Sequence, residues 1–230
     1  RHHGVLLFCA ALFITFFITG FYSSQHDETF VREMLSDSYV NMTEENIEKG
    51  KPFGVYAEGG ALLMWLGIMI NNLFVAFGYF AQGLLLCIPL IISLLTEGVR
   101  LGAFEQMFFA KGLGMQSVLT VFIHGTLEIS AIVIAGAAGV VLGKGWMFPG
   151  TGKRLDAFMR GAKDGVIILA SLIPVFMIAA FFEGFITRYY TMPWWLSGSI
   201  LLLSASYITW YYIIYPIQLQ RRLLANRKTL

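Results

Sequence analysis

Charged residues are scarce in this sequence. Asp, Glu, Lys and Arg make up 13% of its 230 residues, whereas hydrophobic residues make up 57%. A soluble domain carries roughly a quarter charged residues. The shortage therefore excludes an ordinary water-soluble domain. It predicts an all-α, polytopic membrane helix bundle, in which lipid replaces water around much of the chain.

Cysteine, net charge and catalytic motifs are also limited. The two cysteines, Cys9 and Cys87, lie in apolar runs and have no spacing typical of a metal site or a disulfide. A net charge of +2 is too small to favour a nucleic-acid partner. The sequence has neither a phosphate-binding glycine loop nor a Gly-x-Ser-x-Gly motif. We therefore expect no cofactor and favour a protein without enzymatic activity.

Six apolar segments are long enough, or nearly so, to cross a bilayer core of about 30 Å as helices. The predicted spans lie at about 5–22, 60–80, 83–104, 120–143, 165–187 and 195–216. We treat residues 1–230 as one integral-membrane domain, in which segment 23–59 forms short helices outside the cytoplasm. Because the chain begins with Arg1 instead of Met, we also expect further sequence upstream.

Lys and Arg predict the orientation, because basic residues gather on the cytoplasmic side of membrane proteins. They cluster between the fourth and fifth spans and in the C-terminal tail. These residues are Lys144, Lys153, Arg154, Arg160, Lys163, Arg221, Arg222, Arg227 and Lys228. Segment 23–59 is rich in acids instead. We therefore expect both termini in the cytoplasm and segment 23–59 on the outer side.

One predicted span, 120–143, carries an acid and an imidazole. His124 and Glu128 are four residues apart and share a helix face. An ionisable group at the centre of a membrane helix costs about 2.5–3.5 kcal/mol on insertion scales, so it needs a partner or a function. The six spans place further polar residues at a comparable depth: Glu97, Arg100, Glu183 and Arg188, with Asn71 and Asn72 nearer the midplane. We expect one intramembrane polar cluster.

Three interpretations of this cluster stay open. In the first, Glu128 and His124 pair with Arg100 and with Ser or Asn side chains, and hold the helices together. In the second, Glu128 and Glu183 carry protons or ions. In the third, His124, Glu128 and Glu183 ligate a metal ion, since imidazole and carboxylates can bind Zn²⁺. No His-Glu-x-x-His motif accompanies them.

Glycines recur at helical spacing in two of the predicted spans. One pair is Gly98-x-x-x-Gly102, and the other is Gly139-x-x-x-Gly143, which is preceded by Gly136. Such small residues let helix backbones approach closely. They predict tight packing, either within the chain or between the two copies of a homodimer.

Three segments carry a resemblance to a known family. They are Asn71-Asn72 with its Ala/Phe/Gly-rich run, His124-Gly-Thr-Leu-Glu128 with the Ala/Gly run to Gly139, and Ala179-Ala-Phe-Phe-Glu183-Gly-Phe-Ile-Thr187. Over about residues 60–190 the chain resembles the stage II sporulation protein M family of bacterial membrane proteins. The resemblance implies a multi-pass protein of the bacterial plasma membrane. The matching motifs indicate five candidate site residues: Asn71, Asn72, His124, Glu128 and Glu183.

The resemblance also implies a function, because the sporulation member is a membrane scaffold for peptidoglycan-degrading partners. We accordingly expect a non-enzymatic scaffold or subunit in the bilayer that docks envelope or cell-wall-remodelling proteins. One alternative is a transporter or channel for ions or protons that uses the buried Glu/His cluster. A second alternative is a metal-dependent membrane enzyme.

Overall fold

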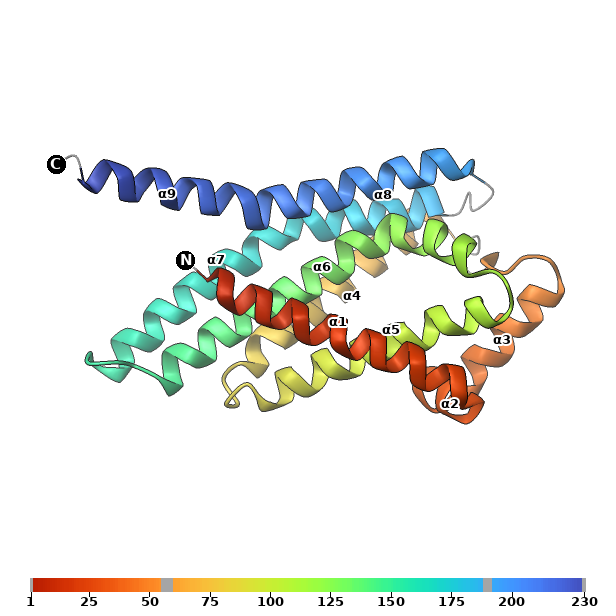
Figure 1. Ribbon diagram of the computed structural model, residues 1–230, viewed down its shortest axis with the longest axis horizontal. Helices are drawn as coiled ribbons and strands as arrows, with labels where there is room; N and C mark the ends of the chain where they lie inside the picture. The colour runs from red at the N-terminus through yellow and green to blue at the C-terminus, as the bar shows by residue number, and fades with distance from the viewer. Residues whose placement is uncertain (1, 55–59, 188–191, 229–230) are drawn as a thin grey trace.

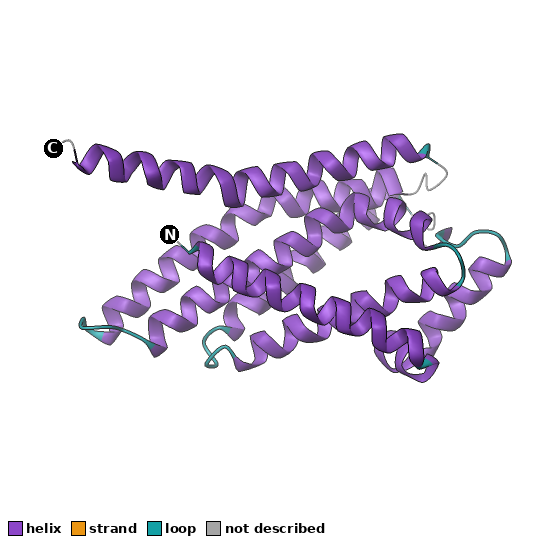
Figure 2. Cartoon of the chain, viewed as in Figure 1, coloured by secondary structure: helices purple, strands orange, loops and turns teal. Residues whose placement is uncertain are grey.

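We describe the fold from a computed structural model, which covers residues 2–54, 60–187 and 192–228. This part of the chain forms helices and contains no strand (Figure 2). The elements are α1 (His3–His26), α2 (Glu28–Leu35), α3 (Asp37–Glu48), α4 (Ala61–Gln82), α5 (Ile88–Ala110), α6 (Gly114–Met147), α7 (Arg154–Phe181), the π-helical segment η2 (Phe182–Ile186), α8 (Trp194–Thr209), the π-helical segment η4 (Trp210–Ile214) and α9 (Tyr215–Lys228). The predicted all-α bundle is confirmed.

The long helices lie side by side along the long axis of the molecule (Figure 1). The start of α1, the α6–α7 turn and the end of α9 lie toward one end of this bundle, and α2 and α3 lie at the other. The predicted basic regions, 144–164 and the C-terminal tail, therefore share one end. The cytoplasmic placement of that end stays a prediction.

Five helical stretches of the described chain are long and apolar enough to cross a membrane: α1, α4, α6, α7 with η2, and α8 through to Arg222. The remaining predicted span, 83–104, falls on α5, which is not among them. Its apolar sequence is interrupted by Glu97, Arg100 and Glu105. Helix α5 nevertheless lies alongside the other long helices, with α1 packed on one of its faces.

Helix α6 occupies the centre of the bundle and packs against α1, α4, α5, α7 and α8. Its C-terminal half is buried almost all round, as its run of Ala, Gly and Val requires. The main core forms around it, with Leu90, Ala131, Leu172, Phe176 and Ala179 fully inaccessible to solvent. This central place brings side chains of α6 into contact with several neighbouring helices.

Both predicted glycine faces pack inside the chain. A Cβ atom added at Gly102 would lie 2.2 Å from the carbonyl oxygen of Phe17 on α1. A Cβ atom at Gly139 would lie 2.6 Å from the carbonyl oxygen of Tyr79 on α4. Gly98, Gly136 and Gly143 are likewise buried and crowded by neighbouring helices. These faces are therefore occupied, and they offer no surface for the homodimer that the sequence left open.

Two short helices cap one end of the bundle, as predicted for segment 23–59. The Asp27 side chain accepts the Thr29 amide at the start of α2, and the Ser36 hydroxyl accepts the Tyr39 amide at the start of α3. Apolar residues of these helices pack on α5 and α6, where Phe53 stacks on Phe108 with ring centroids 5.1 Å apart.

An ion pair ties this cap to the α5–α6 turn. The Lys111 ammonium donates to the Glu44 carboxylate over 2.9 Å, and Arg32 binds the same carboxylate over 3.2 Å. The hydrogen bond from Lys111, together with the charges of both cations, lowers the pKa of Glu44 below its ordinary value. Both contacts are partly exposed, so water weakens them and apolar packing dominates the attachment of the cap.

Candidate functional site

Three of the predicted polar residues meet between α6 and η2. His124, Glu128 and Glu183 each offer one ligand atom, and these atoms all lie within 4.8 Å of one another. A fourth residue joins them from α4, where the Asn72 side-chain amide donates to Oε1 of Glu128 over 2.6 Å. Residues distant in the sequence thus form one small polar site, the His/Glu/Glu site, within an apolar bundle.

Local helix geometry positions the two acids. His124 and Glu128 are one turn apart on α6, so their side chains share a face. Glu183 lies in η2, where the α7 helix widens into π-helical geometry. Such widened turns are frequent at functional sites. The neighbouring Gly184 lets α4 approach, because a Cβ atom there would lie 3.3 Å from backbone atoms of Ala61 and Trp65.

A hydroxyl at the end of η2 fixes the orientation of the imidazole. His124 is 4% exposed, and its Nδ1 lies 3.0 Å from Oγ1 of Thr187. The Thr187 hydroxyl donates its only hydrogen to the carbonyl oxygen of Phe182. The same hydroxyl therefore links the His124 ring to the backbone of η2. Histidines that ligate metals are commonly oriented by such a second hydrogen bond.

The two acids lack a basic partner in the described chain. Neither Glu128 nor Glu183 forms a salt bridge with Lys or Arg of the residues that the structure covers. Arg188, which the sequence placed near them, lies outside the described residues. Two adjacent, partly buried carboxylates repel each other and lose part of their hydration, which is costly for the charged forms. A bound cation or a shared proton removes that cost.

The structure does not bring Glu97 and Arg100 to this site. They pair with each other on α5, with Nη1 of Arg100 3.1 Å from Oε2 of Glu97, and both remain substantially exposed. They line a separate pocket with Tyr39 of the α2–α3 cap. The expected pairing of Arg100 with Glu128 is therefore wrong. The glycine face of α5 packs on α1, so the face that carries Glu97 and Arg100 points away from the His/Glu/Glu site.

The two neighbouring asparagines of α4 differ in their exposure. Asn72 is buried and reaches Glu128, whereas Asn71 is exposed on the other side of α4. Successive helix residues point about 100° apart, so only one of the two can face the bundle interior.

Glu105 is a buried acid that the sequence-based prediction did not include. Glu105 on α5 is 2% exposed, and its Oε1 accepts a hydrogen bond of 3.2 Å from Ser117 on α6. Its Oε2 is buried without a hydrogen-bond partner in the part of the chain that the structure describes. The predicted span ended at residue 104, which placed Glu105 outside the membrane region. The adjacent polar pair Glu105-Gln106 within an apolar helix was the signal available.

Fold and site together define a helical membrane protein with a His/Glu/Glu site, in which His124 is buried and the two acids are partly buried. Residues 9–188 match the family model described as stage II sporulation protein M, and the chain belongs to that family. The match begins well before residue 60, so it includes most of α1 and the cap as well as the segments that carried the resemblance. No curated protein and no solved structure matches the chain.

Proposed function

We propose that this protein binds a divalent metal ion at His124, Glu128 and Glu183 and carries it through the helix bundle. The observation that supports the proposal is the approach of one imidazole nitrogen and two carboxylate oxygens to within 4.8 Å of one another. Mixed imidazole and carboxylate ligands suit first-row divalent ions such as Zn²⁺ or Mn²⁺. Three protein ligands also leave a coordination position open for water or for ligand exchange.

Charge balance supports a metal ion over packing alone. A divalent ion cancels the charges of Glu128 and Glu183 in apolar surroundings, where unpaired charges are most costly. The packing interpretation named Arg100 together with Ser or Asn side chains as partners. Asn72 does bond to Glu128, but Arg100 is engaged with Glu97 instead. The hydrogen bonds from Asn72 to Glu128 and between Thr187 and His124 would orient the ligands, as outer-shell bonds do in metal sites.

A line of polar side chains favours ion movement over catalysis. Ser117, Thr120 and His124 are buried on α6, at spacings that place them along one helix face leading to Glu128. Glu105 contacts the first of them, Ser117, near the end of the bundle that α2 and α3 cap. Intramembrane polar residues arranged in this way commonly mark ion pathways. The metal-dependent enzyme would use the same three ligands but has no need of this line.

Flux into liposomes tests the proposal. We expect the reconstituted protein to carry Zn²⁺ or Mn²⁺ to an enclosed fluorescent indicator. Glu128→Gln, which removes a ligand charge and keeps the side-chain shape, should lower the rate about tenfold or more, because loss of mere outer-shell partners costs 10–100-fold in metal sites. The matched control Glu97→Gln removes an acid of α5 outside the site and should transport at the normal rate.

Two outcomes contradict the transport proposal. One is metal flux no greater than in protein-free liposomes. The other is flux that Glu128→Gln and Glu97→Gln leave equally unchanged, which would separate transport from the His/Glu/Glu site.

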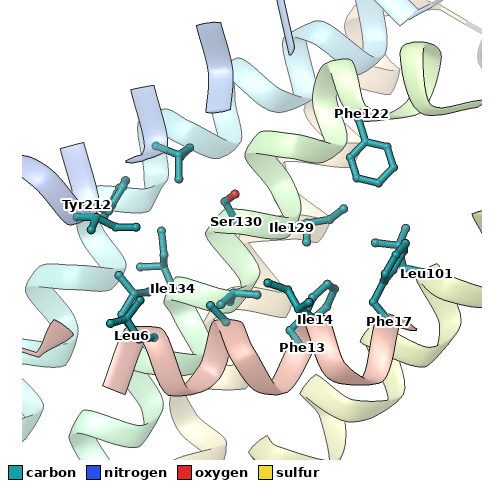
Figure 3. Close-up of a pocket in the computed structure, with 15 residues that line it drawn as sticks. Leu6, Phe13, Ile14, Phe17, Leu101, Phe122, Ile129, Ser130, Ile134 and Tyr212 are labelled. Atoms are coloured by element: carbon teal, nitrogen blue, oxygen red, sulfur yellow. The ribbon is translucent and has the colours of Figure 1, made fainter. Parts of the chain in front are cut away.

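A scaffold role is a second candidate, and one surface favours it. We propose that a groove of about 340 Å³ between α1, α6 and α8 receives a transmembrane helix of a partner protein. Its lining is apolar apart from Ser130, and includes Phe13, Ile14, Ile129 and Tyr212 (Figure 3). A partly exposed serine hydroxyl in a mostly apolar groove suits a helix–helix contact, where an interhelical hydrogen bond adds to close packing.

Site-specific photo-crosslinking tests this groove in native membranes. A photoreactive residue at Ile14 should give one discrete adduct with another membrane protein, whereas the same residue at Leu63, which is 77% exposed on α4, should not. The replacement Ser130→Trp, which fills the groove, should abolish that adduct. Adducts with lipid alone at both positions would refute the docking role.

A further inference from the structure

A second polar pocket lies at the basic end of the bundle, where α6 ends after it leaves the His/Glu/Glu site. It has a volume of about 200 Å³ and is formed by the start of α1, the end of α6 and the start of α7. Lys144 and Arg160 line it from α6 and α7, together with His2, Asp164 and Phe148. Neither the family match nor the proposed transport role assigns a function to these residues.

Close helix packing brings the two cations to one pocket. A Cβ atom at Gly145 would lie 2.8 Å from the carbonyl oxygen of Ala157, and one at Gly161 would lie 2.9 Å from that of Val141. The backbones of α6 and α7 therefore nearly touch beside the pocket. Lys144 adjoins Gly145 and Arg160 adjoins Gly161, so each cation stands next to this contact on its own helix.

The charges of this pocket are unbalanced. The one acid in its lining, Asp164, is already engaged by His2 over 2.8 Å. Lys144 and Arg160 form no salt bridge within the residues that the structure describes. Two cations without acidic partners in a shared concave site favour an anionic ligand, and a phosphate accepts charge-assisted hydrogen bonds from both.

The position of the pocket relative to the apolar part of the bundle indicates where that phosphate comes from. The α4–α5 turn packs against α6 just before Lys144, with Gly83 next to Gly139 and the Cys87 thiol next to Gly143. That turn exposes Leu84, Leu85 and Leu86, as expected of a surface that faces acyl chains. Lys144 therefore lies immediately beyond the apolar belt, at the level of lipid headgroups.

We propose that the pocket between Lys144 and Arg160 binds the phosphate of an anionic phospholipid headgroup from the adjoining leaflet. Phe148, which is 71% exposed at the pocket rim, would pack beside the headgroup of the same lipid. Basic pockets between membrane helices on the cytoplasmic side are a recognised type of lipid site. The inference is independent of metal binding.

Lipid retention by the purified full chain tests the inference. Native mass spectrometry with added phosphatidylglycerol should show a bound lipid, and phosphatidylcholine should bind far less. The double variant Lys144→Gln/Arg160→Gln should weaken phosphatidylglycerol binding about tenfold or more, since two charge-assisted contacts are lost. The control Lys153→Gln/Arg222→Gln removes equal charge outside the pocket and should retain binding.

Three outcomes would overturn the lipid site. Equal loss in both double variants would indicate diffuse attraction to basic residues, and unchanged binding in Lys144→Gln/Arg160→Gln would remove the pocket. Displacement of the lipid by millimolar inorganic phosphate would identify a free-phosphate site instead. Lys144→Arg, which keeps the charge, should bind lipid normally, so a folding defect in the double variant would not imitate the expected result.

Discussion

Replacing Glu183 with Gln should reduce the metal content of the purified protein from about one ion per chain, as a three-ligand site holds, to near background. Glu183 supplies one of the two carboxylates of the site, and Gln keeps its shape while removing its charge. In this variant only His124 and the Glu128 carboxylate remain as ligands, and a single negative charge cannot neutralise a divalent ion in apolar surroundings. His124→Ala should have the same effect, because it removes the only imidazole ligand.

The measurement is elemental analysis by mass spectrometry after the protein is loaded with Zn²⁺ or Mn²⁺ and freed of loosely bound metal. Absorption spectra of the Co²⁺-loaded protein would report the ligands independently. Asn71 and Asn72 provide a matched pair, since only Asn72 reaches Glu128. Asn72→Ala should weaken metal binding about 10–100-fold, as loss of an outer-shell partner does, and Asn71→Ala should leave it unchanged.

Metal content that is equal in the normal protein, Glu183→Gln and Glu97→Gln would disprove a metal site at these residues. This result is distinguishable from a failure of transport. A protein that binds metal in the expected way but gives no liposome flux would keep the site and exclude the carrier role.

Gly102→Ala should destabilise the protein strongly. The added Cβ atom would lie 2.2 Å from the carbonyl oxygen of Phe17 and 2.6 Å from the amide nitrogen of Phe21, both of which are backbone atoms of α1. Because neither atom can rotate away, α1 and α5 must separate along their contact. Overpacking of this kind costs about 1–3 kcal/mol and occasionally more, so we expect a clearly lower thermal unfolding temperature.

Gly67 on α4 is the matched control, because it is also helical and no other heavy atom lies within 4 Å of its added Cβ. Gly67→Ala should leave the unfolding temperature unchanged or raise it slightly, as alanine favours the helix. Thermal unfolding in detergent, followed by size-exclusion chromatography, compares the two variants. Equal behaviour of Gly102→Ala and Gly67→Ala would show that the close approach of α1 and α5 contributes little to stability.

Much of the fold could be predicted from local sequence, but α5 could not be assigned in full. Long apolar runs identify α1, α4, α6, α7 and α8, because a helix in lipid must satisfy its own backbone hydrogen bonds. Helix α5 is ambiguous because charged residues interrupt its apolar sequence. Its glycine face packs on α1, and Glu97 and Arg100 neutralise each other on another face.

The candidate site shows the same division between local and long-range information. The i, i+4 spacing alone places His124 and Glu128 on one face of a helix. Which partners meet that face depends on how each helix is rotated about its axis. A one-residue step separates buried Asn72 from exposed Asn71, and a π-helical turn carries Glu183 toward α6.

The sequence by itself determined that this protein is a bundle of membrane helices with basic residues at one end and an acid next to an imidazole in α6. Apolar length and helical spacing suffice for those conclusions, because they depend on one helix at a time. Only the tertiary structure decided that Glu183, Asn72 and Thr187 complete the site and that Arg100 does not. Those contacts are set by backbone approach at buried glycines, which fixes the rotation of one helix against another.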